Sequence, residues 1–179
     1  MRIIVIGLGI QGKKRRAIAG KDIVATVDPV SADADYCSVY DVDLELFDAA
    51  LCCIPDKPKF EILSFLIKNK KHVLVEKPLW VENDEQIIQL QELAKEKRVQ
   101  CYTAYNHRFE PHFQRMKEIL ASGELGEIYR CRLFYGNGTA RLVRESEWRD
   151  KGAGVLPDLG SHLLDTILFW FENFEKNGR

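Results

Sequence analysis

Short apolar runs alternate with amphipathic stretches along the first part of the chain. Five apolar runs have the length of strands buried on both faces, at 2–9, 22–28, 49–55, 72–78 and 99–105. Helical patterns lie between them at 9–19, 59–69 and 83–98, and Asn83 is predicted to cap the last of these, with Gln86 in capping-box spacing. Strands that alternate with helices are typical of βαβ units. The chain is therefore predicted to begin with a doubly wound parallel sheet, an α/β fold.

The pattern changes near residue 105. Pro111 and Gly123 mark the first turn and the end of a predicted helix. Residues 127–136 alternate between two faces and predict a strand, and a strongly apolar helix is predicted over 158–174. We therefore expect two domains, a Rossmann domain and an α+β domain, with bounds at 1–105 and 106–179.

Composition and charge exclude several classes of protein. The 179 residues carry 26 Lys and Arg against 27 Asp and Glu, so no net field favours nucleic acid or an anionic membrane. The 5 cysteines lack CxxC spacing and the 4 histidines form no metal-ligand pattern. No secretory leader and no apolar run of membrane-spanning length is recognised. A cytoplasmic protein is expected, with its cysteines reduced and in the core, and without a metal, nucleic-acid or membrane partner.

The first predicted strand runs into a glycine-rich loop, IGLGIQG. Gly7, Gly9 and Gly12 have GxGxxG spacing, and Ile10 and Gln11 occupy the variable positions. The first glycine permits the tight turn, the second lets the backbone approach a pyrophosphate, and the third lets the helix pack on the strand. The helix N-terminus then supplies N–H groups and partial positive charge for the anion. These residues predict a dinucleotide site.

Asp28 closes the second predicted strand, 21 positions after Gly7. A carboxylate there accepts hydrogen bonds from the ribose hydroxyls of adenosine and would repel a 2′-phosphate, so NAD is favoured over NADP. An ordinary glycine turn is the alternative for GxGxxG alone, and the flanking strand, helix and Asp28 argue against it. For Lys13 and Arg15 two roles stay open, a phosphate contact or a solvated helix face.

The fourth apolar run ends in Glu76, Lys77 and Pro78. As a bare tripeptide EKP is more often structural than functional, but ligands of a doubly wound sheet bind outside the carboxyl ends of its strands, where Lys77 falls. Near an oxidised, cationic nicotinamide an ammonium loses proton affinity and can serve as a proton donor or base. Pro78 fixes the backbone just beyond it, with a cis peptide as one option.

Asp158 and His162 stand at i and i+4 of the last predicted helix and share a face. A carboxylate beside an imidazole sets its tautomer and tunes it as a general base for an alcohol. The alternative is a helix N-terminal Asp paired with a surface His. Asp165 is expected to be structural or solvent-facing.

Five motifs follow one another along the chain: GxGxxG at the amino terminus, EKPL at 76–79, NHRFEP at 106–111, GELGEI at 123–128 and W…GAGVLPDLGSHLLD at 148–165. In this order they resemble the glucose–fructose oxidoreductase, inositol 2-dehydrogenase and rhizopine-catabolism family (Gfo/Idh/MocA). The resemblance covers essentially the whole chain. EKP followed by DxxxH at this distance is far more specific than the glycine fingerprint alone.

The resemblance implies NAD(P)-dependent oxidation or reduction of a secondary alcohol on a sugar, cyclitol or nucleotide sugar, in a homo-oligomer. A nucleotide sugar is our first expectation, from the closing motif. The implied site residues are catalytic Lys77, Asp158 and His162, with His162 as base; Pro55, Glu76 and Lys77 at the cofactor; and Arg108 and Trp148 at the substrate. Two alternatives stay open: Arg108 paired with a carboxylate such as Glu110, and Trp148 as a partly buried core aromatic.

The chain departs from the family pattern in three places. Residues 29–48 are too short for the usual second helix, and Asp56 and Lys59 replace the customary Asn and His after the third strand. Of the antiparallel sheet that walls the substrate pocket only the strand at 127–136 is expected, which makes the second domain an incomplete α+β domain. A non-catalytic dinucleotide-binding module is therefore the rival to an active enzyme.

Overall fold

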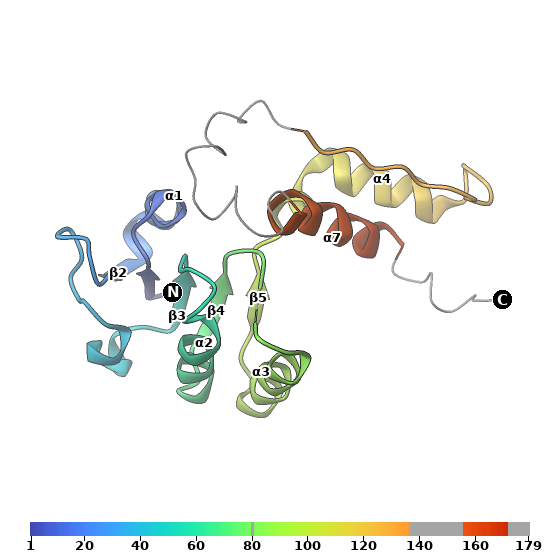
Figure 1. Ribbon diagram of the computed structural model, residues 1–179. Helices are drawn as coiled ribbons and strands as arrows, with labels where there is room; N and C mark the ends of the chain where they lie inside the picture. The colour runs from blue at the N-terminus through green and yellow to red at the C-terminus, as the bar shows by residue number, and fades with distance from the viewer. Residues whose placement is uncertain (80, 137–155, 172–179) are drawn as a thin grey trace. The chain divides into compact units, whose positions relative to one another are not determined.

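The computed structural model describes residues 1–79, 81–136 and 156–171. The chain divides into two compact units, Met1–Ala104 and Tyr105–Arg179 (Figure 1).

The first unit is built on a parallel sheet of 5 strands in the order β2-β1-β3-β4-β5. Their bounds are β1 Ile3–Ile6, β2 Ile23–Val27, β3 Ala49–Cys52, β4 His72–Val75 and β5 Cys101–Thr103. Ile4, Val5 and Ile6 of β1 are all buried, as expected for a central strand covered on both faces. The predicted doubly wound α/β fold is confirmed.

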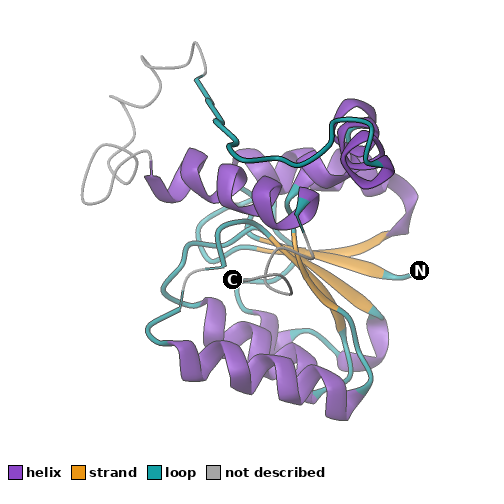
Figure 2. Ribbon diagram, turned by 90° about the vertical axis from the view of Figure 1, so that its right-hand side faces the viewer, coloured by secondary structure: helices purple, strands orange, loops and turns teal. Residues whose placement is uncertain are grey.

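Three helices cover this sheet: α1 (Ile10–Ala19), α2 (Lys59–Lys68) and α3 (Asp84–Lys97). Figures 1 and 2 show α2 and α3 side by side on one face and α1 on the other. The side chains of Leu63, Leu66 and Ile67 on α2 are fully buried, because this helix packs both on the sheet and on α3.

The amino end of α3 has the predicted cap. Asn83 accepts a hydrogen bond from the backbone N–H of Gln86, 3.0 Å away. In return the Gln86 side chain accepts from the backbone N–H of Glu82, also at 3.0 Å. In a regular capping box the Gln86 side chain would accept from the N–H of Asn83 itself. Here it accepts from the residue before the cap, whose N–H also has no partner within the helix.

The connection from β2 to β3 contains no α-helix, as predicted from its length. It makes two short 3₁₀ turns, at Val39–Asp41 and Leu44–Leu46. The Lys71 ammonium donates to the carbonyl oxygens of Leu44 and Phe47 at 2.6 and 2.9 Å, and Arg2 donates to the Glu45 carbonyl at 2.6 Å. The cationic side chains of Lys71 and Arg2 thus donate to backbone carbonyl oxygens that would accept hydrogen bonds from backbone N–H groups in a helix.

The second unit contains a 3₁₀ turn (Asn106–Phe109), α4 (Pro111–Ser122), a π-helical turn (Leu156–Gly160) and α7 (Ser161–Trp170). Pro111 stands in the first turn of α4 and Gly123 ends it with φ +76°, as predicted. The indole N–H of Trp170 donates to the Phe113 carbonyl at 3.0 Å, and the two rings stack with centroids 5.5 Å apart. These contacts join α4 to α7.

The predicted strand at 127–136 is wrong, because these residues form no regular element. Tyr129 and Phe134 have exposed fractions of 89% and 92%. Alternation specifies a strand only where a neighbouring strand supplies backbone partners. Among the residues that the structure describes, no strand pairs with this segment, so it runs as an extended chain beside α4 in Figure 1.

Within the described ranges, no helix is both long and apolar enough to cross a membrane.

Replacing Lys71 by Met should lower the free energy of unfolding by about 1–3 kcal/mol, because two carbonyls lose their donor. Chemical denaturation checks the size of the loss. Lys68→Met, an exposed lysine on α2, is the matched control and should stay within about 0.5 kcal/mol of the parent chain. Equal stability of the two variants would show that Lys71 does not hold the connection.

Candidate functional site

The carboxyl ends of the strands share one register. Ile6 pairs with both Val27 and Cys52, and Cys52 pairs in turn with Val75. The residues that come directly after the four strands, Gly7, Asp28, Cys53 and Glu76, therefore emerge along one edge of the sheet. Ligands of doubly wound sheets bind outside this edge.

Two of the loop glycines are required by the protein's own packing. Gly7 has φ +89°, and a Cβ there would lie 2.3 Å from the Cys53 carbonyl oxygen. A Cβ at Gly12 would lie 1.7 Å from the Gly7 carbonyl oxygen. Because that oxygen belongs to the backbone, only a backbone shift could relieve the clash. These contacts hold α1 close against β1 and β3.

Gly9 has a different explanation, because a Cβ there would meet no heavy atom within 4 Å. Gly9 is the N-cap residue of α1, and no side chain makes a capping hydrogen bond there. Ile10 and Gln11, in the first turn of the helix, are exposed. An open space in front of uncapped helical N–H groups fits a pyrophosphate, which would cap them.

Asp28 is tied to this loop by hydrogen bonds. Its Oδ2 accepts from the Leu8 backbone N–H at 2.7 Å, and its Oδ1 accepts from Val30 and Ser31 at 2.9 Å each. These backbone bonds, that of Leu8 foremost, hold the pKa of the Asp28 carboxyl below its usual range. The carboxylate is thus charged at neutral pH and keeps lone-pair capacity for ribose hydroxyls.

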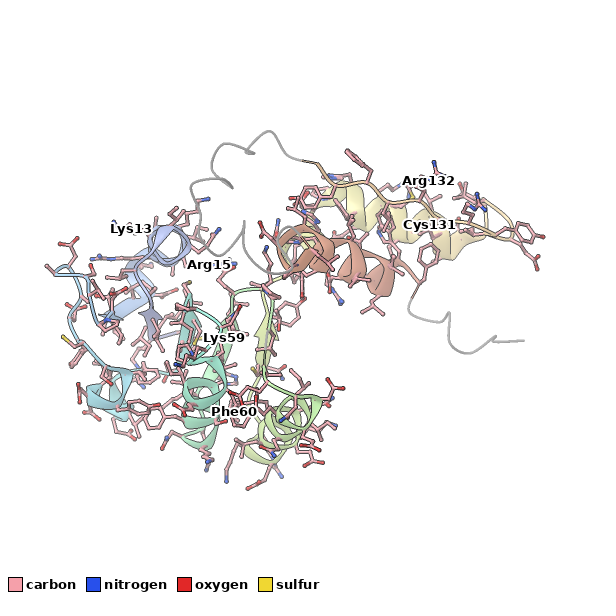
Figure 3. All side chains as sticks on the ribbon, viewed as in Figure 1. Lys13, Arg15, Lys59, Phe60, Cys131 and Arg132 are labelled. Atoms are coloured by element: carbon pink, nitrogen blue, oxygen red, sulfur yellow. The ribbon has the colours of Figure 1, made fainter. Side chains whose placement is uncertain are left out.

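Arg15 is not part of a solvated helix face, because it forms an ion pair with Glu76. Its Nε and Nη2 both lie 2.7 Å from Glu76 Oε1. Lys13, on the same helix, is exposed (Figure 3). The pair links α1 to the residue that follows β4. The partner of Arg15 lies 61 positions away in the sequence, and no local spacing indicates it.

Lys77 follows Glu76 at the same edge, and the Lys77–Pro78 peptide bond is cis. Pro55, assigned to the cofactor with them, lies exposed in the loop after β3. Lys59, which replaces the customary His of the family pattern, is unexpectedly buried. Its side chain is only 2% exposed, and its ammonium lies 2.6 Å from Asp56 Oδ1 and 2.5 Å from the Pro78 carbonyl oxygen. The apolar periodicity of α2 gives no sign that its first residue is a buried cation.

The cysteines offer no nucleophile at this edge. Burial, with the charge of Glu76 as a smaller cause, raises the pKa of the Cys53 thiol to about 12. Burial also raises the pKa of Cys52 and brings that of Cys101 to about 11. These three pack in the sheet as expected. Cys37 and Cys131 are exposed, contrary to the expectation of core residues.

In the second unit, Asp158 and His162 are both buried. Asp158 lies in the π-helical turn and His162 in the first turn of α7, so the predicted helix changes its geometry between them. The His162 ring centroid lies 4.5 Å from that of His107 and within 6 Å of the rings of Tyr105 and Tyr135, at 5.8 and 5.9 Å. The sequence analysis had not placed His107 beside the predicted base.

Arg108 is paired with Asp165, and not with Glu110. Arg108 Nε lies 3.0 and 2.9 Å from the two Asp165 oxygens, and Nη2 lies 2.6 Å from Oδ1. Asp165 is buried, so the expected structural role is confirmed. Glu110 instead accepts from Asn106 at 3.0 Å and lies 3.2 Å from His112. The Arg108–Asp165 pair joins the NHRF turn to α7.

Trp148 lies outside the described residues. The assignment of Lys77, Asp158 and His162 to one catalytic site draws on both units and stays a prediction. The predicted cofactor residues Gly7, Gly9, Gly12, Asp28 and Glu76 all lie at one edge of the first unit.

A parallel sheet with a GxGxxG loop and an acidic residue after its second strand defines the class of Rossmann dinucleotide-binding proteins. Residues 1–105 match the oxidoreductase family with an NAD-binding Rossmann fold, and residues 113–176 match the GFO/IDH/MocA C-terminal domain. The chain belongs to the Gfo/Idh/MocA family of oxidoreductases, which confirms the resemblance of its motifs.

The curated relatives that the chain matches are about twice as long as the chain, which spans about 40% of their length in these alignments. Glucose-6-phosphate 3-dehydrogenase of Bacillus subtilis is 31% identical over 138 residues, which are 72% of this chain and 39% of that protein. An uncharacterized oxidoreductase of Schizosaccharomyces pombe is 29% identical over 90% of this chain and 41% of its own length.

Solved structures share the fold. An inositol dehydrogenase homolog of Azotobacter vinelandii, complexed with NADH and myo-inositol, superposes with a TM-score of 0.77 at 22% identity. The match covers 97% of this chain and 53% of that one. At this identity the likeness shows the fold alone.

Gly9 and Gly12, at the start of α1, should respond differently to substitution by Ala. Gly12→Ala should lower the free energy of unfolding by about 3 kcal/mol or more, because its methyl would overlap the Gly7 carbonyl. Gly9→Ala should cost about 1 kcal/mol or less, the penalty of a poor N-cap. Thermal and urea unfolding of both variants measures the difference. Equal losses would mean that Gly9 is required for packing and not for a ligand.

Proposed function

We propose that this chain supplies the NAD-binding half and part of the substrate half of an oxidoreductase. The enzyme transfers hydride between nicotinamide and a secondary alcohol of a sugar, cyclitol or nucleotide sugar. The observation that carries the proposal is the loop of Gly9, open in front of α1, with the Asp28 carboxylate bonded to its Leu8 amide. Residues 1–105 would form the cofactor domain and 106–179 part of the substrate and oligomer domain.

NAD is the proposed cofactor. Asp28 carries its charge at neutral pH because three backbone amides stabilise the carboxylate. A 2′-phosphate on the adenosine ribose would meet this charge and be repelled, whereas free hydroxyls would donate to it. A relative that is 30% identical over 120 residues is an NADP⁺-dependent scyllo-inositol 2-dehydrogenase of Bacillus subtilis, so the preference has to be measured.

Three residues are proposed to handle the alcohol. NAD held at the Gly9 loop and Asp28 would supply the hydride-transfer chemistry. Lys77 would donate a hydrogen bond to the reacting oxygen. His162 would take the hydroxyl proton, and buried Asp158 would orient its imidazole. Arg108 is held by Asp165, so it supports α7 rather than supplying a free charge to the substrate.

The relatives' names support the proposed substrate class. They include a glucose-6-phosphate 3-dehydrogenase and inositol 2-dehydrogenases. A nucleotide sugar remains our expectation from the closing motif, and inositols and glucose 6-phosphate join it as candidates. Assembly into a homo-oligomer is part of the proposal.

A dinucleotide-binding module without turnover is the second candidate. The observation that favours it is the segment 127–136, which forms no strand within the described residues and leaves Tyr129 and Phe134 exposed. A sheet that walls a substrate pocket is therefore not built by this segment itself.

Cofactor preference should depend on the charge of Asp28. We expect titration calorimetry to show NADH binding at least about tenfold more tightly than NADPH. Asp28→Asn should narrow that ratio by about tenfold, since repulsion of the 2′-phosphate is lost. Asp33→Asn, an exposed neighbour in the same connection, is the matched control and should leave the ratio unchanged. Binding of NADPH as tight as NADH by the parent chain would contradict the NAD assignment.

Turnover should depend on Lys77 while cofactor binding does not. Turnover is assayed with myo-inositol, scyllo-inositol, glucose 6-phosphate and nucleotide sugars as candidate substrates. Lys77→Met should lower the turnover rate by about 10²-fold or more and leave the affinity for NADH unchanged. Lys57→Met, an exposed lysine after β3, is the control and should turn over normally. NADH binding without turnover of any substrate by the parent chain would favour the module over the enzyme.

A further inference from the structure

The buried ammonium of Lys59 connects two loops at the carboxyl edge of the sheet. Its partners are Asp56 Oδ1 at 2.6 Å, in the loop after β3, and the Pro78 carbonyl oxygen at 2.5 Å, in the loop after β4. The Lys59 side chain is 2% exposed and the Asp56 side chain 50% exposed. A cation this deeply buried is retained only where close polar partners replace its hydration.

The position of Lys59 has no explanation within its own helix. Lys59 is the first residue of α2, which begins without a side-chain cap. The amino end of a helix carries partial positive charge, so a cation is disfavoured there. An aliphatic side chain would fill the same space without this penalty. The Asp56 and Pro78 bonds are therefore what sets this residue apart from an ordinary core side chain.

Arg15 holds the other neighbour of Lys77. From α1, on the opposite face of the sheet, it donates twice to Glu76 Oε1 at 2.7 Å. The Glu76 backbone N–H in turn donates to the Cys52 carbonyl at 2.9 Å. Figure 3 labels Arg15 and Lys59, which reach the end of β4 from α1 and α2 respectively.

Lys77 thus lies between two residues that are each held by a cation from a different helix. We propose that Arg15 and Lys59 are positioning residues that fix the backbone of Glu76, Lys77 and Pro78, and so the direction in which Lys77 leaves the sheet. The inference rests on the proposed function in one respect, that Lys77 is the residue whose placement matters. The family pattern does not carry it, because Lys59 stands where a His is customary.

A purely stabilising role makes a different prediction from a positioning role. If the two cations only add stability, their loss speeds hydrogen exchange throughout the unit by the same factor. If they position the segment, exchange quickens at Glu76, Lys77 and Leu79 while the buried α2 amides of Leu63 and Leu66 keep their protection.

The experiment measures backbone amide exchange by NMR in the 179-residue chain. Lys59→Met and Arg15→Met should each speed exchange at residues 76, 77 and 79 by about tenfold or more. Arg15→Lys, which keeps one charged donor, should restore part of the protection. Lys68→Met on α2 and Lys14→Met on α1 are exposed matched controls that should change nothing. Leu66→Val supplies a core variant that is destabilised without touching either cation.

Unchanged exchange rates at residues 76, 77 and 79 in both Met variants would overturn the proposal. An increase at these residues in Leu66→Val as large as that in the Met variants would also overturn it. If Lys59→Met does not fold, Asp56→Asn tests the same contact from its half-exposed partner, with faster exchange at 77 and 79 expected. The readout needs no cofactor. If NADH does not bind the parent chain but local exchange responds as expected, the proposed function fails and the positioning role stands.

Discussion

The first unit depends on the common register in which its parallel strands end. Because Ile6, Val27, Cys52 and Val75 lie opposite one another, every residue that follows them emerges at the same edge. Parallel pairing brings together groups that are far apart in the sequence, and no single loop has to be long. The close approach of α1 at Gly12 and the bond from Leu8 to Asp28 then give this edge its shape.

Local signals predicted most of the regular elements in the described residues. The β-branched runs, the Asn83 cap, the Pro111 and Gly123 boundaries and the GxGxxG loop each act over a few residues, and each matches the structure. These features need only a period, a dihedral angle or a nearby N–H, which neighbouring residues specify.

The errors and omissions have one physical cause, a partner that is distant in the sequence. For Arg108 one of the two expected roles was pairing with a carboxylate such as Glu110, two residues away, whereas the structure pairs it with Asp165, 57 positions on. The partner of Arg15 is 61 positions away, and one of the two partners of Lys59, the carbonyl of Pro78, is 19 positions away. The strand at 127–136 fails for a related reason, since pairing requires a second strand that alternation alone cannot supply.

The Lys71 ammonium also has a consequence for the order in which the chain folds. Its two carbonyl partners precede it by 27 and 24 residues, and Lys71 itself stands just before β4. The loop from β2 to β3 therefore acquires these bonds only after later chain has arrived, and closing such a non-local contact costs entropy before it gives stability. The segment after Asp28 therefore keeps these bonds only when the chain as far as Lys71 is in place, so the acidic side of the cofactor edge depends on residues beyond β3.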